Sequence, residues 1–175
     1  MKKLNLSLFK FILIFFLTLS NLAFSETKII SYDAIEVGVT DGDSLRFGKE
    51  RIRLFGIDAP EIKQICNDKF KKPYACGEEA KKNLDEFILS ASAAKKKIYC
   101  YYSERDKYNR ILGECFWGET KSININRFMV LFGHAIAYLR YSDKYLDDQE
   151  IAKAIKLGLW QGDFDMPEDW RKKNK

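Results

Sequence analysis

The chain has 175 residues, which is enough for one domain with a sizeable core. Hydrophobic residues make up 46% of it and charged residues 31%, a balance that excludes a disordered chain and predicts a folded one. The formal net charge is +5.

The first 25 residues have the pattern of a secretory signal peptide. A basic start at residues 1–3 precedes an apolar run at residues 9–22, and residues 23–25 have the small-x-small form of a cleavage site. An uncleaved membrane anchor is the less favoured alternative, because the apolar run is short for a span. The sequence therefore predicts an exported domain at residues 26–175, periplasmic or extracellular, without stable membrane association.

Cleavage would also change the charge. It would remove Lys2, Lys3 and Lys10 and no acidic residue, which leaves 27 basic and 25 acidic residues and a net charge of +2. A strongly basic surface is thereby excluded, so any binding of nucleic acid would depend on a local arrangement of side chains.

Four cysteines lie in the exported part of the chain, an even number that suits disulfides in an oxidising compartment. We expect Cys66 to pair with Cys76, closing a loop, and Cys100 with Cys115, joining two neighbouring strands. A zinc site is the alternative, but the spacings contain no C-x2-4-C pair.

The first half of the domain has the pattern of a β-meander followed by a helix. Strands are expected at residues 35–40, 44–47 and 51–57, separated by turns at Asp41-Gly42 and at Gly48. After an irregular stretch, Gly77 opens a helix. Its apolar stripe consists of Ala80, Leu84, Phe87, Ile88 and Ala91.

The second half predicts two strands, two helices and a tail. The strands are residues 98–102 and 111–117, joined by a polar loop. Ser122 is expected to cap a buried second helix that ends at Gly133, and a third helix runs from Asp147 to Gly158. We expect residues 164–170 to be irregular and 171–175 to fray. The fold class is α+β, mainly β: a five-stranded OB-fold barrel with three packed helices.

The stretch at residues 53–61 concentrates polar groups at the end of a buried strand. It contains Arg53, Asp58 and Glu61, and Asp41 and Asp43 precede it by one predicted hairpin. Several carboxylates so placed could reach one hard cation. Each aspartate alone is also explained by turn chemistry. The only histidine, His134, is expected to pack at a helix end.

Two further groups could contact a nucleic acid. Residues 105–110 form a basic and aromatic hairpin tip suited to phosphates and bases, and Tyr138 and Tyr141 flank a cation. Charged tips are common, and packing explains the tyrosines equally well.

In combination, these motifs resemble the thermonuclease family, of which staphylococcal nuclease is the best-known member. The resemblance covers residues 35–160. It rests on five groups in order, which are Asp41-Gly42-Asp43-Ser44, Arg53-x4-Asp58-Ala59-Pro60-Glu61, Asp106-Lys107-Tyr108-Asn109-Arg110, Gly133 with Tyr138 and Tyr141, and Gly158-Leu159-Trp160. The fold that the resemblance implies is an OB barrel.

The resemblance also implies a role for each matching residue. Asp43, Asp58 and the backbone carbonyl of Ala59 match ligands of a calcium ion, with Asp41 as an outer carboxylate. Arg53 and Arg110 match arginines that grip the scissile phosphate, and Glu61 matches the residue that activates water. Lys107, Tyr108, Tyr138 and Tyr141 match positions near the bound nucleotide. Asn109 stands where glycine is common and tolerates the same positive-φ geometry.

The implied activity is hydrolysis of DNA and RNA, with single strands preferred, by a secreted, calcium-dependent and monomeric nuclease. Water would attack phosphorus and the 5′ oxygen would leave, which gives 3′-phosphate ends. The alternative from another class is a non-catalytic OB module that binds nucleic acid or a protein partner. A phosphodiesterase specific for mononucleotides is a weaker third hypothesis.

Overall fold

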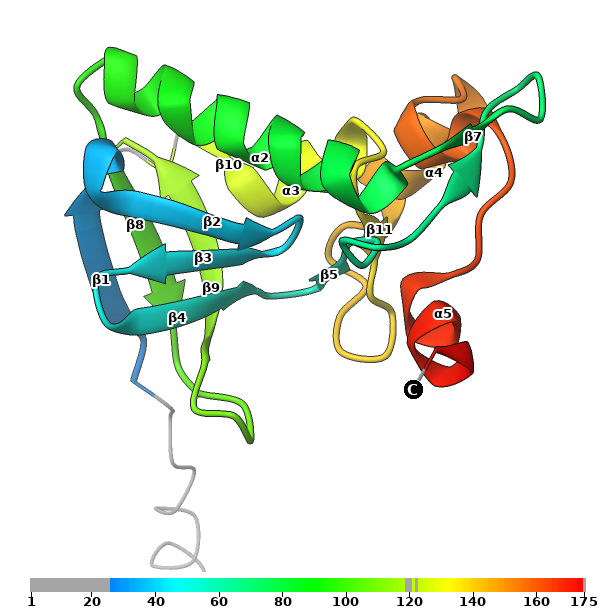
Figure 1. Ribbon diagram of the computed structural model, residues 1–175. Coiled ribbons are helices and arrows are strands. Elements are labelled where there is room, and N and C mark those ends of the chain that lie inside the picture. Colours follow the sequence, from blue (N-terminus) through cyan, green and yellow to red (C-terminus); the bar gives the residue numbers. More distant parts are fainter. Residues whose placement is uncertain (1–25, 119–120, 122, 175) are drawn as a thin grey trace, which may run out of the picture.

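A computed structural model describes residues 26–118, 121 and 123–174 (Figure 1). The predicted signal peptide and the predicted helix cap Ser122 lie outside these residues. Within them, no helix combines the length and hydrophobicity that crossing a membrane requires.

Seven strands form the main sheet. They are β1 (Lys28–Asp33), β2 (Val37–Asp41), β3 (Ser44–Phe47), β4 (Glu50–Leu54), β8 (Lys97–Tyr102), β9 (Ile111–Trp117) and β10 (Ile123–Asn124), and a 3-10 turn, η2 (Ala34–Glu36), links β1 to β2. The strand order is β1-β8-β9-β4-β3-β2, with β10 added to β9. Among the described strands of this sheet, β4 and β9 are the one parallel pair, which brings the end of the meander beside the second pair of strands.

Four α-helices accompany the sheet: α2 (Cys76–Ala93), α3 (Ile125–Leu131), α4 (Leu146–Ala154) and α5 (Pro167–Lys173), with a 3-10 turn η3 (Gly158–Gln161) after α4. Two small ladders complete the described chain. In one, β5 (Ile57–Asp58) pairs with β11 (Ile136–Ala137), and in the other β6 (Cys66–Asn67) pairs with β7 (Pro73–Tyr74).

Helix α2 covers the sheet and supplies part of the core. It runs along one side of the strands in Figure 1 and buries the stripe that the sequence predicts, including Leu84 at 0% exposure. On the strands, Leu45, Ile52 and Ile111 are buried as well. Each such side chain contributes about 1.5–3 kcal/mol by leaving water, so this helix-on-sheet contact stabilises the elements that carry the site.

The structure corrects the predicted architecture in three respects. The α+β class is confirmed, but the main sheet has seven strands rather than five. Its pairing path has two ends, β1 and β2, so a closed barrel is not shown among the described residues. There are four described α-helices rather than three, because residues 167–173, expected to be irregular or frayed, form α5.

Strand β1 and the cap of α3 were also missed. Strand β1 alternates exposed and half-buried residues along the sheet edge, a weak hydrophobic signal. Helix α3 is capped by Asn124, whose side chain accepts a hydrogen bond of 2.9 Å from the backbone N–H of Arg127.

Both predicted disulfides are confirmed. Cys66 and Cys76 are bonded across the loop before α2, and Cys100 and Cys115 are bonded between β8 and β9, where they are directly opposed in the ladder. No cysteine is free, so zinc, the alternative explanation of the four cysteines, has no thiolate to use.

Candidate active site

The site is built on two buried carboxylates. Asp43 lies in the turn between β2 and β3 at 2% exposure, and Asp58 ends β5 at 0% exposure. The backbone N–H of Ala59 donates to Asp43 Oδ2 at 2.8 Å, and the Ser44 hydroxyl donates to Asp43 Oδ1 at 3.1 Å. These bonds fix the Asp43 carboxylate against the residue that follows Asp58.

Small residues allow this close approach. A Cβ on Gly42 would lie 2.7 Å from the Ala59 Cβ and 2.9 Å from the Ala80 Cβ on α2. Gly42 is therefore required where the turn, the end of β5 and the helix meet.

Arg53, on β4, joins the two carboxylates. Its Nη1 contacts Asp43 Oδ1, and its Nη2 donates to Asp58 Oδ1 at 2.7 Å. Burial opposes the charge on Arg53, but Asp43 and Asp58 more than offset it and raise its pKa above the usual value. Burial raises the pKa of Asp43 to about 7, against the opposing effect of Arg53. The protonation of Asp43 therefore depends on the positive charges that lie close to it.

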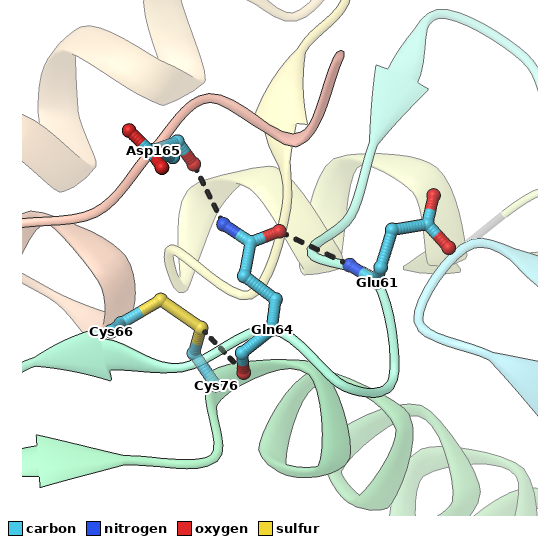
Figure 2. The surroundings of a disulfide bond; sticks show 5 residues. All are labelled: Glu61, Gln64, Cys66, Cys76 and Asp165. Atoms are coloured by element: carbon cyan, nitrogen blue, oxygen red, sulfur yellow. Dashed lines mark hydrogen bonds between the residues drawn. A yellow bond between two sulfur atoms is a disulfide. The ribbon is translucent and has the colours of Figure 1, made fainter. Parts of the chain in front are cut away.

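Glu61 is held by Gln64, which lies beside the first disulfide (Figure 2). The Glu61 backbone N–H donates to Gln64 Oε1 at 3.3 Å, and Gln64 Nε2 donates to the backbone oxygen of Asp165 at 2.7 Å. Gln64 is fully buried, and its own carbonyl oxygen lies 3.4 Å from Cys76 Sγ. Gln64 therefore fixes the Glu61 backbone, while the Glu61 side chain stays partly exposed.

The start of α2 fixes Glu61 from the other side. A Cβ on Gly77 would lie 1.7 Å from the Glu61 carbonyl oxygen, so only glycine fits there. The backbone of Glu61 is thus enclosed between the first turn of α2 and the chain segment that leads to α5.

Arg171, on α5, is a site residue that sequence reasoning missed. Its Nη1 donates to Asp58 Oδ1 at 3.0 Å and to Glu61 Oε1 at 2.9 Å, and its Nη2 donates to Asp58 Oδ2 at 2.9 Å. Burial opposes its charge, yet Asp58 and Glu61 raise its pKa above the usual value. Its position in a tail expected to fray concealed it.

The predicted residues gather around one open cavity of about 780 Å³. Its lining includes Asp41, Arg53, Glu61, Lys107, Tyr108, Arg110, Tyr138 and Tyr141, together with Arg171. Asp43, Asp58 and Ala59 are buried and do not line it. The structure thus brings together side chains that the sequence separates by more than a hundred positions.

The tip between β8 and β9 forms one wall of the cavity. The Asp106 carboxylate accepts a hydrogen bond of 2.8 Å from Arg110 Nε, which fixes the orientation of that guanidinium. Tyr108 is 59% exposed, with Lys107 Nζ 5.0 Å and Arg110 Cζ 5.7 Å from its ring centre. Asn109 has φ 61°, so the predicted positive-φ turn at this residue is confirmed.

Tyr138 and Tyr141 also line the cavity. The rings of Tyr138 and Tyr141 meet edge to face with centroids 5.0 Å apart. The Tyr138 hydroxyl donates to Glu168 on α5 at 3.2 Å, while the Tyr141 ring is 62% exposed. Tyr138 is thus tied to α5, and Tyr141 leaves a ring face for a ligand.

The donor set suits a hard cation. Asp43 and Asp58 are oxygen donors that converge on one side chain, and Asp41 and Glu61 add two carboxylates beside them. As they stand, no three acidic, imidazole or thiolate side chains of the described residues converge closely enough to hold a metal ion. The carboxylates point instead at Arg53 and Arg171.

Comparisons with known proteins agree with this geometry. A family model described as "Staphylococcal nuclease homologue" matches residues 51–162. The "Micrococcal nuclease" of Shigella flexneri is 31% identical over an alignment of 155 residues that covers 79% of this chain and 80% of that protein. An "Uncharacterized endonuclease" of Haemophilus influenzae is 33% identical over an alignment of 147 residues that covers 79% of this chain and 72% of that protein.

A third relative is longer. The "Succinoglycan biosynthesis protein ExoI" of Rhizobium meliloti is 33% identical over 129 residues, 72% of this chain but 63% of that protein. The matched family region contains Arg53, Asp58, Glu61 and Arg110, whereas Arg171 lies beyond it. The chain therefore belongs to the family of staphylococcal nuclease homologues, a family of phosphodiester hydrolases.

Proposed function

We propose that the protein is a calcium-dependent nuclease that hydrolyses DNA and RNA and leaves 3′-phosphate ends. One observation carries the proposal. Arg53, Glu61 and Arg110, from three separate segments of the chain, line a single cavity, and Arg53 contacts two buried carboxylates. A binding module would have no evident need for two buried acids, which are costly to desolvate.

The arginines would bind the scissile phosphate. A phosphodiester is anionic and repels nucleophiles, so its charge has to be neutralised before water attacks. Planar guanidinium groups donate paired hydrogen bonds to phosphate oxygens and stay charged at any working pH. Arg53 from β4 and Arg110 from the tip between β8 and β9 both line the cavity, and they would stabilise the added negative charge of the transition state.

The acids would hold the cation. Asp43, Asp58 and the Ala59 carbonyl would ligate calcium, with Asp41 as an outer carboxylate. When bound, calcium polarises a phosphoryl oxygen and orients water. The buried N–H···O bond from Ala59 to Asp43 keeps these groups adjacent.

Glu61 would position or deprotonate the attacking water. A carboxylate can accept a proton from a water molecule or align it for attack. Its backbone is fixed through Gln64, whereas its side chain is partly exposed toward the cavity. The leaving group would be the 5′ oxygen.

The remaining lining residues would bind the substrate. Lys107 would contact a phosphate, while Tyr108, Tyr138 and Tyr141 would contact bases. Base stacking on aromatic rings needs an accessible base face, which single strands offer and duplexes do not. The exposed rings of Tyr108 and Tyr141 support the proposed preference for single strands.

We also propose that the protein is exported and acts as a monomer without stable attachment to a membrane. The signal-peptide pattern at residues 1–25 and two disulfides support export, because disulfides persist in oxidising compartments.

The test is digestion of single-stranded DNA and of RNA by the purified protein with calcium or with a chelator, with the product ends identified. We expect cleavage only with calcium, and 3′-phosphate ends. Arg53→Ala should reduce turnover by about 10²–10³-fold, while Arg46→Ala, an exposed arginine on β3, should not. Equal digestion in chelator would refute the calcium assignment. A folded protein that binds DNA and never cuts it would support the non-catalytic module instead.

A further inference from the structure

The guanidinium of Arg171 satisfies the Asp58 carboxylate more completely than Arg53 does. It contacts both oxygens, at 3.0 and 2.9 Å, and reaches Glu61 as well. Together with Arg53, three N–H···O bonds reach Asp58, a carboxylate with 0% side-chain exposure. Both Asp58 oxygens are therefore occupied by positive groups from the protein itself.

Helix α5 is held in place by polar contacts. Glu168 accepts from the Tyr138 hydroxyl at 3.2 Å and from Arg140 at 2.9 Å. Before the helix, the Asp165 carbonyl accepts from buried Gln64. These contacts fix the approach of Arg171 to the carboxylates.

The same helix has little apolar anchoring. Pro167 is its only buried residue. Elements with few buried apolar contacts open at low free-energy cost. Arg171 is thus positioned by contacts that can be exchanged while the core stays intact.

We propose that Arg171 is an internal competitor for the cation. In the metal-free protein its guanidinium neutralises Asp58 and Glu61, and a divalent cation binds Asp58 only when Arg171 withdraws. This inference rests on the proposed function, because it assumes that Asp58 is a metal ligand. It assigns to α5, outside the matched family region, control over the affinity of the site.

The occupancy of the Asp58 oxygens supports the exchange. Oδ1 accepts hydrogen bonds from Arg53 and Arg171, and Oδ2 accepts one from Arg171. A divalent cation bound to Asp58 would need the space that a guanidinium now fills, and it would place three positive groups around one buried carboxylate. Like charges at such short range repel strongly where water is excluded. One guanidinium therefore has to leave.

Burial identifies Arg171 as the group that leaves. The Arg53 side chain is 17% exposed and bridges both buried carboxylates. The Arg171 side chain is 31% exposed, and its second partner, Glu61, is 36% exposed. Water can replace the contacts of Arg171 more cheaply than those of Arg53.

The test compares calcium affinities by isothermal titration calorimetry at fixed ionic strength. Arg171→Gln removes the competing charge. Lys173→Gln removes the same charge from the same helix, where the Lys173 side chain is 61% exposed and forms an ion pair with Asp165. We expect Arg171→Gln to bind calcium at least about tenfold more tightly than wild type, in the usual range of coupling between two ligands of one site. Lys173→Gln should stay within about twofold of wild type.

A second variant tests the role of helix α5 without changing Asp58, Glu61 or Arg171. Glu168→Ala removes the contacts with Tyr138 and Arg140, so it should also tighten calcium binding. Urea unfolding in chelator establishes that each variant is folded. Adding saturating calcium should stabilise Arg171→Gln more than it stabilises wild type at the same concentration.

The outcomes separate this inference from the proposed function. Equal or weaker calcium binding by Arg171→Gln overturns the inference, and calcium-dependent cleavage by wild type would leave the proposed function standing. Calcium binding that tightens as expected supports the inference. If wild type then fails to cut nucleic acid, the proposed function alone is wrong.

Discussion

Asp58 shows how a buried acid can be both costly and retained. It has no exposed surface, and two guanidinium groups offset the free energy of removing its charge from water. Loss of either arginine would leave a buried charge partly unpaired. Substitutions at this residue are therefore expected to affect folding and activity together, which makes Asp58 a poor choice for a purely functional test.

Glu61 offers a cleaner functional test. We predict that Glu61→Gln lowers kcat by about 10²–10⁴-fold, because the amide cannot accept a proton, while the side chain still fits beside Arg171. Glu104→Gln is the matched control, since Glu104 lines the same cavity and has no proposed role in the chemistry. Steady-state kinetics with calcium give both values. Equal losses in the two variants would mean that overall charge, and not Glu61, matters.

The buried His134 should make the free energy of unfolding depend on pH. Burial lowers its pKa from 6.5 to about 4, so the folded protein holds a neutral imidazole that the unfolded chain would protonate. The stabilisation is therefore fully present above pH 6.5 and is lost as the pH falls toward 4. It amounts to about 3 kcal/mol at most.

The measurement is urea unfolding across that pH range. Glu79 and Tyr74 line the same small cavity as His134. Carboxylates elsewhere in the protein also change charge in this pH range, so the pH dependence of wild type alone does not report on His134. The difference between wild type and His134→Gln isolates the histidine. We expect this difference to shrink as the pH falls, and a constant difference would contradict a buried neutral imidazole.

Among the elements, the first turn of α2 is the most tightly constrained. We predict that Gly77→Ala destabilises the protein by at least about 3 kcal/mol and displaces Glu61, because the added carbon would overlap a backbone carbonyl. Gly38→Ala is the control. Its nearest neighbours are side-chain atoms of Arg46 at 3.6 Å, so it should cost less than about 1 kcal/mol. Thermal unfolding and activity together would detect both effects.

Elements with a strong hydrophobic period could be predicted from the sequence. The second strand of the meander, the second strand pair and α2 match their expected positions, because alternation and the helical stripe report directly on burial. The first meander strand begins later than predicted, since residues 34–36 form η2, and the third ends at Leu54 before a turn that leads to β5. Helix α5 has no such stripe. Its signals were local: Pro167 at the first turn, acids after it and bases at the end.

The site residues also divide into those that could be predicted from the sequence and one that could not. Residues that belong to compact motifs, such as Arg53 with Asp58, were found because their neighbours in sequence are also their neighbours in space. Arg171 is separated from Asp58 by 113 positions, and no periodicity connects them. Only the folded path of the chain, through Gln64 and Asp165, brings them together.

At the scale of the whole molecule, the two disulfides should have equal effects on stability and unequal effects on activity. They close loops of 10 and 15 residues, so each should contribute about 3 kcal/mol by restricting the unfolded chain. Replacing Cys66 and Cys76 with alanine should also reduce turnover, because this disulfide contacts Gln64, which holds the Glu61 backbone. Replacing Cys100 and Cys115 should not. Kinetics below the melting temperature distinguish the two, and equal turnover would contradict this role of the first disulfide.

The contact among Gly42, Ala59 and Ala80 constrains how the site can evolve. A Cβ added to Gly42 would lie 2.7 Å from the Ala59 Cβ and 2.9 Å from the Ala80 Cβ, so any side chain at position 42 needs room from both neighbours. Homologous chains that gained a side chain at this position should therefore have changed at one of the other two positions as well. We expect sequence divergence next to the proposed metal site to proceed by paired replacements. Single replacements there should be selected against.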